Sequence, residues 1–84
     1  VFTGVILRNQ EKTVRFTVKT SVYFRSLGSS EIEHYVKHFQ PLDKAGSYGI
    51  QDWIGLIGVQ KIEGSYTNVM GLPTQELYLA LQNF

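Results

Sequence analysis

An alternation of apolar and polar residues from Thr13 to Arg25 constrains the fold more than any other feature. Only Thr20 interrupts the apolar series, which consists of Val14, Phe16, Val18, Val22 and Phe24. A period of two is typical of a strand with one face against a core and the other against water. Such strands usually pair antiparallel, and the β-rich run Phe2 to Leu7 is the simplest partner, with residues 8–12 as the hairpin loop.

Two helices are predicted after this strand. The run from Ser30 to Glu33 has the capping-box pattern, in which a hydroxyl and a carboxylate accept hydrogen bonds from exposed backbone N–H groups. Pro41 ends this helix shortly after Gln40. A last helix is expected after Gly71-Leu72-Pro73, because proline is favoured in a first turn. The predicted apolar faces are Ile32, Tyr35, Val36 and Phe39 on the first helix and Leu77, Tyr78, Leu81 and Phe84 on the last.

The segment between the helices predicts a second, more buried strand. It covers residues 53–59 and then Gln60 to Glu63, and its glycines imply close backbone approach or a bulge. Residues 64–68 have the chemistry of a turn. The pattern therefore predicts an α+β fold, in which a mixed sheet with an antiparallel hairpin packs against two helices. With 84 residues, 43% of them hydrophobic, we expect a single domain over residues 1–84.

Composition excludes several classes of function. Eight Lys and Arg and seven Asp and Glu are scattered along the chain, so no basic stripe for a nucleic-acid polymer forms. Cysteine is absent, which removes thiolate catalysis and agrees with a reducing cytosol. No apolar run approaches the roughly 20 residues that span a bilayer. We expect a soluble, cytoplasmic protein, and a chain that opens directly on strand residues predicts a piece of a longer one.

The irregular stretch DKAGSYGIQDW is the candidate site. Gly46 and Gly49 flank residues 47–48, so the backbone can reach positive φ or approach a ligand closely. Consecutive N–H groups in such loops can also cradle an anion.

Asp43 and Lys44 are adjacent in this stretch and point in different directions outside a helix. One interpretation gives Lys44 a phosphate and Asp43 a metal ion, a lysine or a backbone cap. The alternative is that Asp43 caps a short helix, Lys44 is solvated and the glycines form plain turns. Residues alone favour this alternative, because a Gly-x-x-Gly spacing is a weak signal.

Other candidate site residues have weaker support from the sequence. His34 and His38 are spaced to share a helix face, but no carboxylate or further histidine completes a set at metal-ligand spacing. Trp53 is able to stack on a base, although in an apolar run a tryptophan more often belongs to the core.

Two motifs carry a family resemblance. PLDKAGSYGIQ, from Pro41 to Gln51, and IEGSYTNVMGLP, from Ile62 to Pro73, resemble in order and spacing the C-terminal half of the Maf family. Val1 to Val5 resembles the family strand just upstream, so the resemblance covers essentially the whole chain. Members of that family are nucleoside triphosphate pyrophosphatases, also called septum formation inhibitors. The resemblance implies the C-terminal lobe of the two-lobed Maf/ITPase-like fold.

The resemblance also implies an activity. Members are cytosolic enzymes that use a divalent metal, Mg²⁺ or Mn²⁺, to cleave a nucleoside triphosphate between the α and β phosphates, as house-cleaning of the nucleotide pool, whether canonical or modified. Asp43 and Lys44 then support catalysis, and Lys44, Gly46 and Gly49 bind substrate. Gln51 matches the residue that contributes to substrate choice in the dTTP/UTP subfamily. Its amide can both donate to and accept from a pyrimidine edge.

The departure from the family is large. The Ser-Pro-Arg-Arg signature and the Ala-Asp-Thr motif with the general base belong to an N-terminal half that this sequence does not contain. One lysine cannot supply the charge that pyrophosphate chemistry needs, so we expect these 84 residues alone to be inactive. The expected partners are a nucleoside triphosphate, the N-terminal half and, through exposed apolar surface, a second copy. The alternative function is a non-catalytic nucleotide-binding or interaction module.

Overall fold

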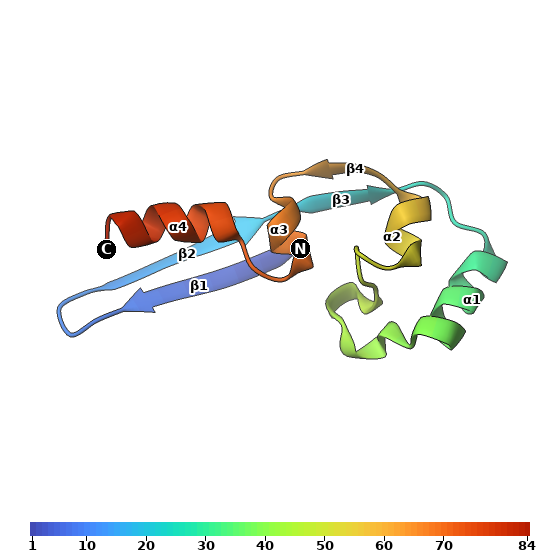
Figure 1. Ribbon diagram of the computed structural model, residues 1–84, viewed down its shortest axis with the longest axis horizontal. Coiled ribbons are helices and arrows are strands. Elements are labelled where there is room, and N and C mark those ends of the chain that lie inside the picture. Colours follow the sequence, from blue (N-terminus) through green and yellow to red (C-terminus); the bar gives the residue numbers. More distant parts are fainter. The chain divides into compact units, whose positions relative to one another are not determined.

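A computed structural model describes all of residues 1–84. The chain forms two compact units, which are described separately: unit 1 comprises Val1–Ser21 and Ile62–Phe84, and unit 2 comprises Val22–Lys61. In chain order the elements are β1 (Phe2–Arg8), β2 (Thr13–Lys19), β3 (Ser21–Phe24), α1 (Ser29–Phe39), the 3₁₀ turns η1 (Pro41–Asp43) and η2 (Ala45–Ser47), α2 (Trp53–Gly58), β4 (Val59–Glu63), α3 (Tyr66–Met70) and α4 (Thr74–Gln82). Figure 1 labels the helices and strands. The predicted α+β class is confirmed.

The antiparallel hairpin of unit 1 is also confirmed. Strands β1 and β2 pair from Phe2 opposite Lys19 to Arg8 opposite Thr13. Burial alternates along both strands, and Val5 faces Phe16 on the half-buried side. The two strands are joined by a tight loop in which the Asn9 side-chain oxygen accepts hydrogen bonds from two backbone N–H groups, each at 2.8 Å.

Thr20, the residue that interrupts the alternation, is one of the most buried side chains in the chain. It is 1% exposed, as is Asn68 of α3. The Asn68 amide donates to Thr20 Oγ1 at 3.0 Å and to the Val18 carbonyl at 3.2 Å. The Thr20 hydroxyl in turn donates to the Ser65 carbonyl at 3.1 Å. Thus β2 ends and β3 begins at a buried polar residue that joins the hairpin to α3.

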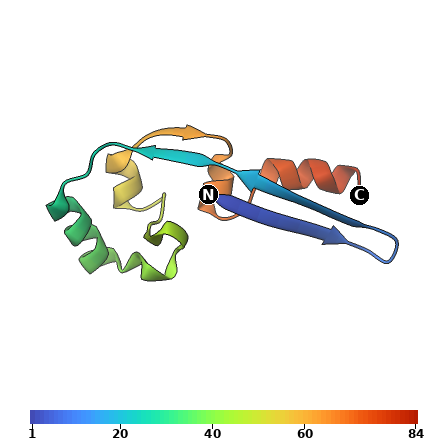
Figure 2. The ribbon, with the colours of Figure 1, turned by 180° about the vertical axis from the view of Figure 1, so that it is seen from behind.

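Helix α4 lies along the hairpin in both ribbon views (Figures 1 and 2). Lys12 at the hairpin loop donates to the Asn83 carbonyl at 3.2 Å, and its ammonium lies 5.0 Å from the centre of the Phe84 ring. The expected last helix is confirmed: it begins at Thr74, directly after Pro73, which is the N-cap rather than part of the first turn. Of the predicted apolar face, Tyr78 and Leu81 are exposed.

Helix α1 of unit 2 begins earlier than its predicted capping box. Gly28 is the N-cap, and its N–H donates to the Glu31 carboxylate at 2.9 Å, so Glu31 and not Glu33 occupies the third position. Arg25 fixes this choice, since its guanidinium donates to both Glu31 oxygens at 3.1 and 2.6 Å. The predicted end is confirmed: the helix ends at Phe39, before the buried Pro41.

The strand predicted over residues 53–59 is wrong. These residues form helix α2 up to Gly58, and only β4 is strand. Periodicity does not separate a short apolar helix from a buried strand. The helix is fixed by Asp52, whose carbonyl accepts from Gly55 and Leu56 at 3.0 and 3.3 Å. The close approach implied by the glycines is confirmed, because a Cβ on Gly55 would lie 1.9 Å from the Ile50 carbonyl oxygen.

The turn predicted over residues 64–68 is also only partly right. Gly64 turns the chain with a φ of 116°, but helix α3 begins two residues later. Ser65 is its N-cap and accepts from the Asn68 N–H at 3.1 Å. Serine and asparagine favour turns and caps for the same reason, so composition alone did not separate the two.

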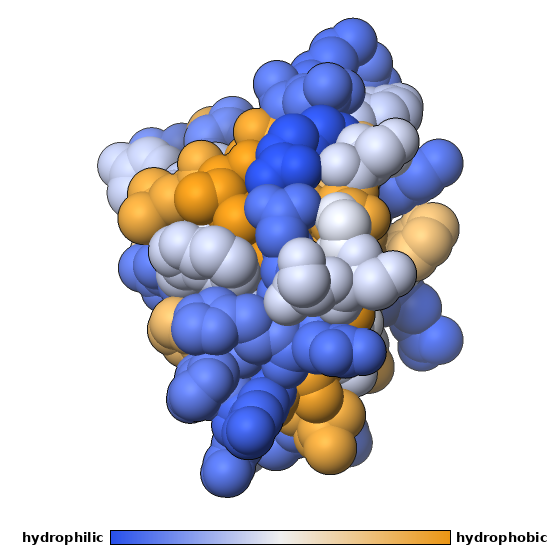
Figure 3. Space-filling model, turned by 90° about the vertical axis from the view of Figure 1, so that its right-hand side faces the viewer, coloured by the Kyte–Doolittle hydropathy of each residue, from blue (hydrophilic) through white to orange (hydrophobic).

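Little apolar surface is fully buried. Tyr35, Ile50 and Ile54, all in unit 2, are the buried hydrophobic side chains, whereas fifteen large hydrophobic residues are exposed. Figure 3 shows hydrophobic areas at the surface among hydrophilic ones. No helix has the length and apolar character that crossing a lipid bilayer requires.

Candidate functional site

The candidate loop, residues 43–51 of unit 2, comprises the end of η1, the turn η2, the extended residue Tyr48 and the first residues of a turn that begins at Gly49. The Lys44 N–H donates to the Pro41 carbonyl at 3.0 Å, and the Ser47 N–H donates to the Lys44 carbonyl at 2.9 Å. Gly46 has a φ of 70°, which glycine adopts without strain. The neighbouring Ser47 has a φ of 58°. The glycine is therefore needed where the second turn reverses the chain.

The three polar candidates of the loop are all exposed. Asp43, Lys44 and Gln51 make no side-chain hydrogen bond or ion pair with the rest of the chain. Asp43 is the last residue of η1 and caps neither 3₁₀ turn, since the N-cap positions are Gln40 and Lys44. The interpretation of Asp43 as a helix cap is therefore wrong, and its carboxylate faces solvent.

The N–H groups of the loop are largely used within the chain. Those of Lys44 and Ser47 close the 3₁₀ turns, and that of Gly49 donates to the Tyr35 hydroxyl at 2.8 Å. An anion at this loop would consequently be held by the Lys44 ammonium rather than by a nest of these three amides.

A buried hydroxyl anchors the second half of the loop. Tyr35 of α1 is 3% exposed, and its hydroxyl donates to Asp52 Oδ2 at 2.8 Å while accepting from the Gly49 N–H. Burial raises the pKa of Tyr35; the Gly49 N–H lowers the pKa and Asp52 raises it. The phenol therefore keeps its proton at neutral pH and remains a donor to the carboxylate.

Gly49 to Asp52 forms a closed turn, because the Asp52 N–H donates to the Gly49 carbonyl at 3.0 Å. Gln51 is the third residue of this turn. A Cβ on Gly49 would lie 2.7 Å from Asp52 Oδ2 and 3.4 Å from Lys44 Cδ. The absence of a side chain at Gly49 thus lets the Lys44 stem and the Asp52 carboxylate approach the same point. Asp43 and Gly46 are not brought to this point by any recorded contact.

Sequence reasoning missed Tyr35 and Asp52. Tyr35 was predicted as one member of an apolar stripe, yet it is the only member of that stripe with a hydroxyl. Asp52 precedes the first residue of α2 in the N-cap position, where aspartate is common. A buried hydroxyl such as that of Tyr35 requires a hydrogen-bond partner. Asp52, an acidic residue beside the loop, was a candidate for that partner.

An apolar hollow of about 310 Å³ adjoins the loop. Tyr48 contributes to it and packs edge-on against Phe24, with ring centres 5.1 Å apart. Burial raises the pKa of Tyr48. The hollow offers no charged side chain, so it is not a phosphate subsite. Its lining is Phe24, Leu27, Ile32, Tyr35, Val36, Gly46, Ser47, Tyr48 and Ile54.

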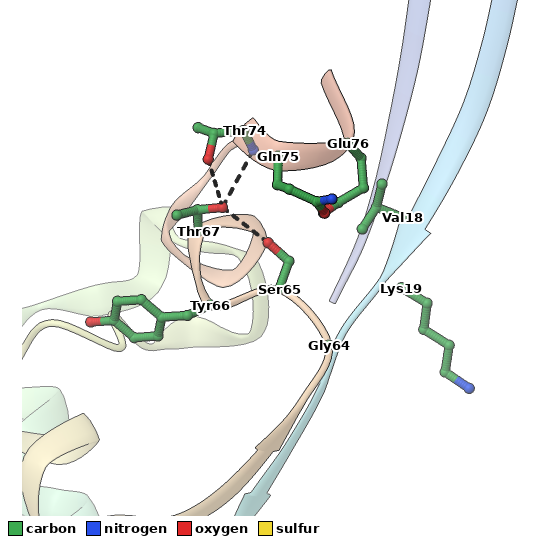
Figure 4. A pocket seen from close by; sticks show the side chains of 9 residues that line it. All are labelled: Val18, Lys19, Gly64, Ser65, Tyr66, Thr67, Thr74, Gln75 and Glu76. Atoms are coloured by element: carbon green, nitrogen blue, oxygen red, sulfur yellow. Dashed lines mark hydrogen bonds between the residues drawn. The ribbon is translucent and has the colours of Figure 1, made fainter. Parts of the chain in front are cut away.

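A second, more polar hollow of about 560 Å³ lies in unit 1 (Figure 4). Its hydroxyl groups form a chain: Thr67 Oγ1 lies 2.9 Å from Ser65 Oγ and accepts from the Thr74 hydroxyl at 3.1 Å and the Thr74 N–H at 3.3 Å. These groups join the start of α3 to the start of α4. The hydroxyl groups are satisfied within the chain, whereas Glu76 Oε2 in the lining is buried without a hydrogen-bond partner.

The histidine pair lies in a cluster of aromatic rings. The rings of His34 and His38 lie with centres 4.5 Å apart, and His34 packs edge-on against Trp53 at 5.1 Å. Trp53 also stacks with Phe39 at 6.3 Å, so its ring belongs to an aromatic cluster on α1 and α2. No group of three or more metal-ligating side chains occurs in the chain.

The chain belongs to the family described as Maf-like protein, which matches residues 1–84. It is 52% identical over 84 residues to the dTTP/UTP pyrophosphatase of Parabacteroides distasonis, covering all of this chain and 44% of that protein. It is 55% identical over 82 residues to the dTTP/UTP pyrophosphatase of Bacteroides fragilis, covering 98% of this chain and 42% of that protein.

These matches confirm the resemblance to the Maf family. The chain spans about two fifths of the length of these curated relatives.

Proposed function

We propose that this chain is the C-terminal lobe of a nucleoside triphosphate pyrophosphatase that hydrolyses dTTP and UTP to the monophosphate and pyrophosphate. The observation that carries the proposal is the identity of 52 and 55% to two proteins named dTTP/UTP pyrophosphatase. The chain contributes one wall of the substrate site, formed by residues 43–51. The remainder of the site, including the general base, belongs to an N-terminal half.

Lys44 is the group that contacts the triphosphate. It is exposed, and its side chain is not paired with any carboxylate of the chain. Its stem passes over Gly49, where a larger residue would meet it. An ammonium acts on phosphate as a point charge, so it neutralises part of the negative charge on the leaving pyrophosphate. Gly46 and Gly49 shape the backbone that carries it.

Gln51 reads the base. It is exposed at the third position of the Gly49–Asp52 turn and makes no hydrogen bond of its own. A pyrimidine presents both a donor and an acceptor edge, which an amide can match. Replacing Gln51 with glutamate removes the donor, so the preference for thymine and uracil should weaken.

A divalent metal, Mg²⁺ or Mn²⁺, fits this lobe only as an ion that arrives with the nucleotide. The chain has no cluster of three ligating side chains, and Asp43 is the exposed carboxylate of the loop. Magnesium is commonly held by one or two carboxylates together with substrate phosphates, so Asp43 is suited to be one ligand. The ion would supply charge neutralisation at the phosphates.

The lobe requires its other half. One lysine and one aspartate are too few to stabilise the charge that develops in the transition state, and much apolar surface is exposed. The 84-residue chain alone is accordingly inactive and associates with an N-terminal half or with a second copy. A cytoplasmic location, house-cleaning of canonical or modified nucleotides and a link to inhibition of septum formation belong to the same proposal.

The test is pyrophosphate release from dTTP, UTP, CTP, dATP and GTP with Mg²⁺ or Mn²⁺. It is run on the 84-residue chain and on a full-length protein containing it. We expect the full-length protein to cleave dTTP and UTP best and the chain to be inert. A full-length protein that binds nucleotide without cleaving it would make this loop part of a non-catalytic binding module.

A further inference from the structure

One hydroxyl group holds both ends of the turn that carries Gln51. The Tyr35 hydroxyl accepts from the N–H of Gly49, the first residue of the turn, and donates to the carboxylate of Asp52, its last residue, each at 2.8 Å. The turn is closed by the Asp52 N–H at 3.0 Å from the Gly49 carbonyl. Because Tyr35 is 3% exposed, water does not replace this contact easily.

The direction of the Gln51 side chain depends on this turn. Gln51 is exposed and has no side-chain partner in the chain. The backbone between Gly49 and Asp52 therefore sets the direction of the Gln51 Cα–Cβ bond, from which the amide extends. The neighbouring Ile50 is buried, which fixes one flank of the turn, and the Tyr35 hydroxyl fixes its two ends.

We propose that Tyr35, together with Asp52, is a positioning residue that sets base selectivity by fixing the turn from Gly49 to Asp52 on which Gln51 is carried. Neither side chain touches the nucleotide; both act through Gln51. This inference rests on the proposed function, because it assumes that Gln51 reads the base.

The variant that tests the inference is Tyr35→Phe in the full-length protein. Phenylalanine keeps the ring in the core and its stacking on Phe39, whose ring centre lies 5.0 Å away, and removes only the hydroxyl. We expect the ratio of kcat/KM for dTTP over that for GTP to fall by roughly fivefold, through a higher KM for dTTP with little change in kcat. Hydrogen exchange at the Gly49 amide should quicken by a comparable factor.

Two substitutions at Asp52 separate positioning from packing. Asp52→Asn retains an oxygen that accepts from Tyr35 and should preserve selectivity, whereas Asp52→Ala should reduce it as Tyr35→Phe does. The Asp52 side chain makes no capping bond to α2, so the alanine variant leaves the backbone bonds of that helix in place. The matched control is Tyr78→Phe, which removes an exposed hydroxyl from α4 and should change nothing.

The outcomes distinguish the inference from the function on which it rests. Selectivity in the wild type that survives Tyr35→Phe and Asp52→Ala overturns the inference alone, even when those variants lose stability. A full-length wild type that releases no pyrophosphate from any nucleotide overturns the proposed function and this inference with it. A folded Tyr35→Phe protein with unchanged exchange at Gly49 also contradicts the proposed contact.

Discussion

Each of the two units is stabilised internally by a different kind of interaction. In unit 1 the most buried side chains include Thr20 and Asn68, which are polar and are joined by a hydrogen bond of 3.0 Å. In unit 2 the buried side chains include the hydrophobic Tyr35, Ile50 and Ile54, and backbone segments approach closely at Gly55. The polar centre of unit 1, Thr20 and Asn68, depends on the hydrogen bonds that the Asn68 amide donates, since Asn68 Oδ1 has no partner. The apolar centre of unit 2 depends on close packing, so a different substitution should destabilise each unit.

The candidate loop belongs to unit 2, the unit that is stabilised by close apolar packing. Its exposed side chains, Asp43, Lys44 and Gln51, have no partner in the chain, while the backbone beneath them is tied to the buried Tyr35. In unit 1 the hydroxyl groups of the larger hollow are satisfied by one another. The exposed Asp43, Lys44 and Gln51 thus differ from these hydroxyl groups in being free to contact a ligand.

Gly55→Ala should have the largest effect, on unit 2. Its Cβ would lie 1.9 Å from the Ile50 carbonyl oxygen, so backbone must move. Alanine gains about 1 kcal/mol of helix propensity over glycine, but we expect a net loss of about 2 to 3 kcal/mol in the free energy of unfolding. Urea unfolding of the full-length protein measures it.

Gly4→Ala is the matched control for that substitution, because nothing lies within 4 Å of its Cβ. It should change the free energy of unfolding by less than about 0.5 kcal/mol. Equal losses at the two glycines would show that close packing does not distinguish α2 from the hairpin.

Asn68→Ala should destabilise unit 1 by about 2 kcal/mol, because it removes the donor to Thr20 and to the Val18 carbonyl and leaves a small cavity. Asn83→Ala removes an asparagine whose amide donates to the Leu79 carbonyl at an exposed site, and should cost far less. Urea unfolding compares the two variants. A neutral Asn68→Ala would refute the polar centre, and the unit would then be held by its hairpin alone.

The ion pair between Arg25 and Glu31 makes the stability of unit 2 depend on pH in the acidic range. The hydrogen bonds from Arg25 and from the Gly28 N–H lower the pKa of Glu31 from 4.5 to about 2. Because the pKa is depressed in the folded state, its stabilisation is present above pH 4.5 and is lost as the pH falls toward about 2. The effect is small, since both side chains are about one third exposed.

The acid dependence is measured as the difference in unfolding free energy between the wild type and Glu31→Gln at a series of pH values. This difference should shrink between pH 4.5 and 2. Glu33→Gln, on the same helix without this arginine contact, serves as the control. A Glu31→Gln difference that stays constant over this range would exclude the ion pair as a stabilising contact.

The regular periodic parts of the fold were predictable. The alternation around Val14, Phe16 and Val18 gave the hairpin and its inward face, and Pro41 marked the end of α1. The start of α1 was not predictable, because Glu31 and Glu33 both fit a capping pattern and only Arg25, which lies outside the helix, decides between them. Local patterns do not contain such tertiary contacts.

The less regular segments show the same limit. Residues 53–58 form a helix although their apolar run has no decisive period, and the interruption at Thr20 became a buried anchor through a residue 48 positions away. For the candidate site, the sequence identified the exposed residues of the loop but not Tyr35 and Asp52 beneath it. Residues that can bind a ligand are recognised from their chemical type in the sequence. The residues that hold them in place are recognised only from contacts in the structure.

Hydrogen–deuterium exchange on the full-length protein, with and without a non-hydrolysable dTTP analogue, tests most directly whether unit 2 carries the nucleotide-binding wall. We predict slower exchange on binding for the amides of residues 43–51, and no change for residues 64–76 around the larger hollow of unit 1. Protection confined to residues 64–76, with residues 43–51 unchanged although the analogue is bound, would contradict the assignment of the site to the Asp43–Gln51 loop.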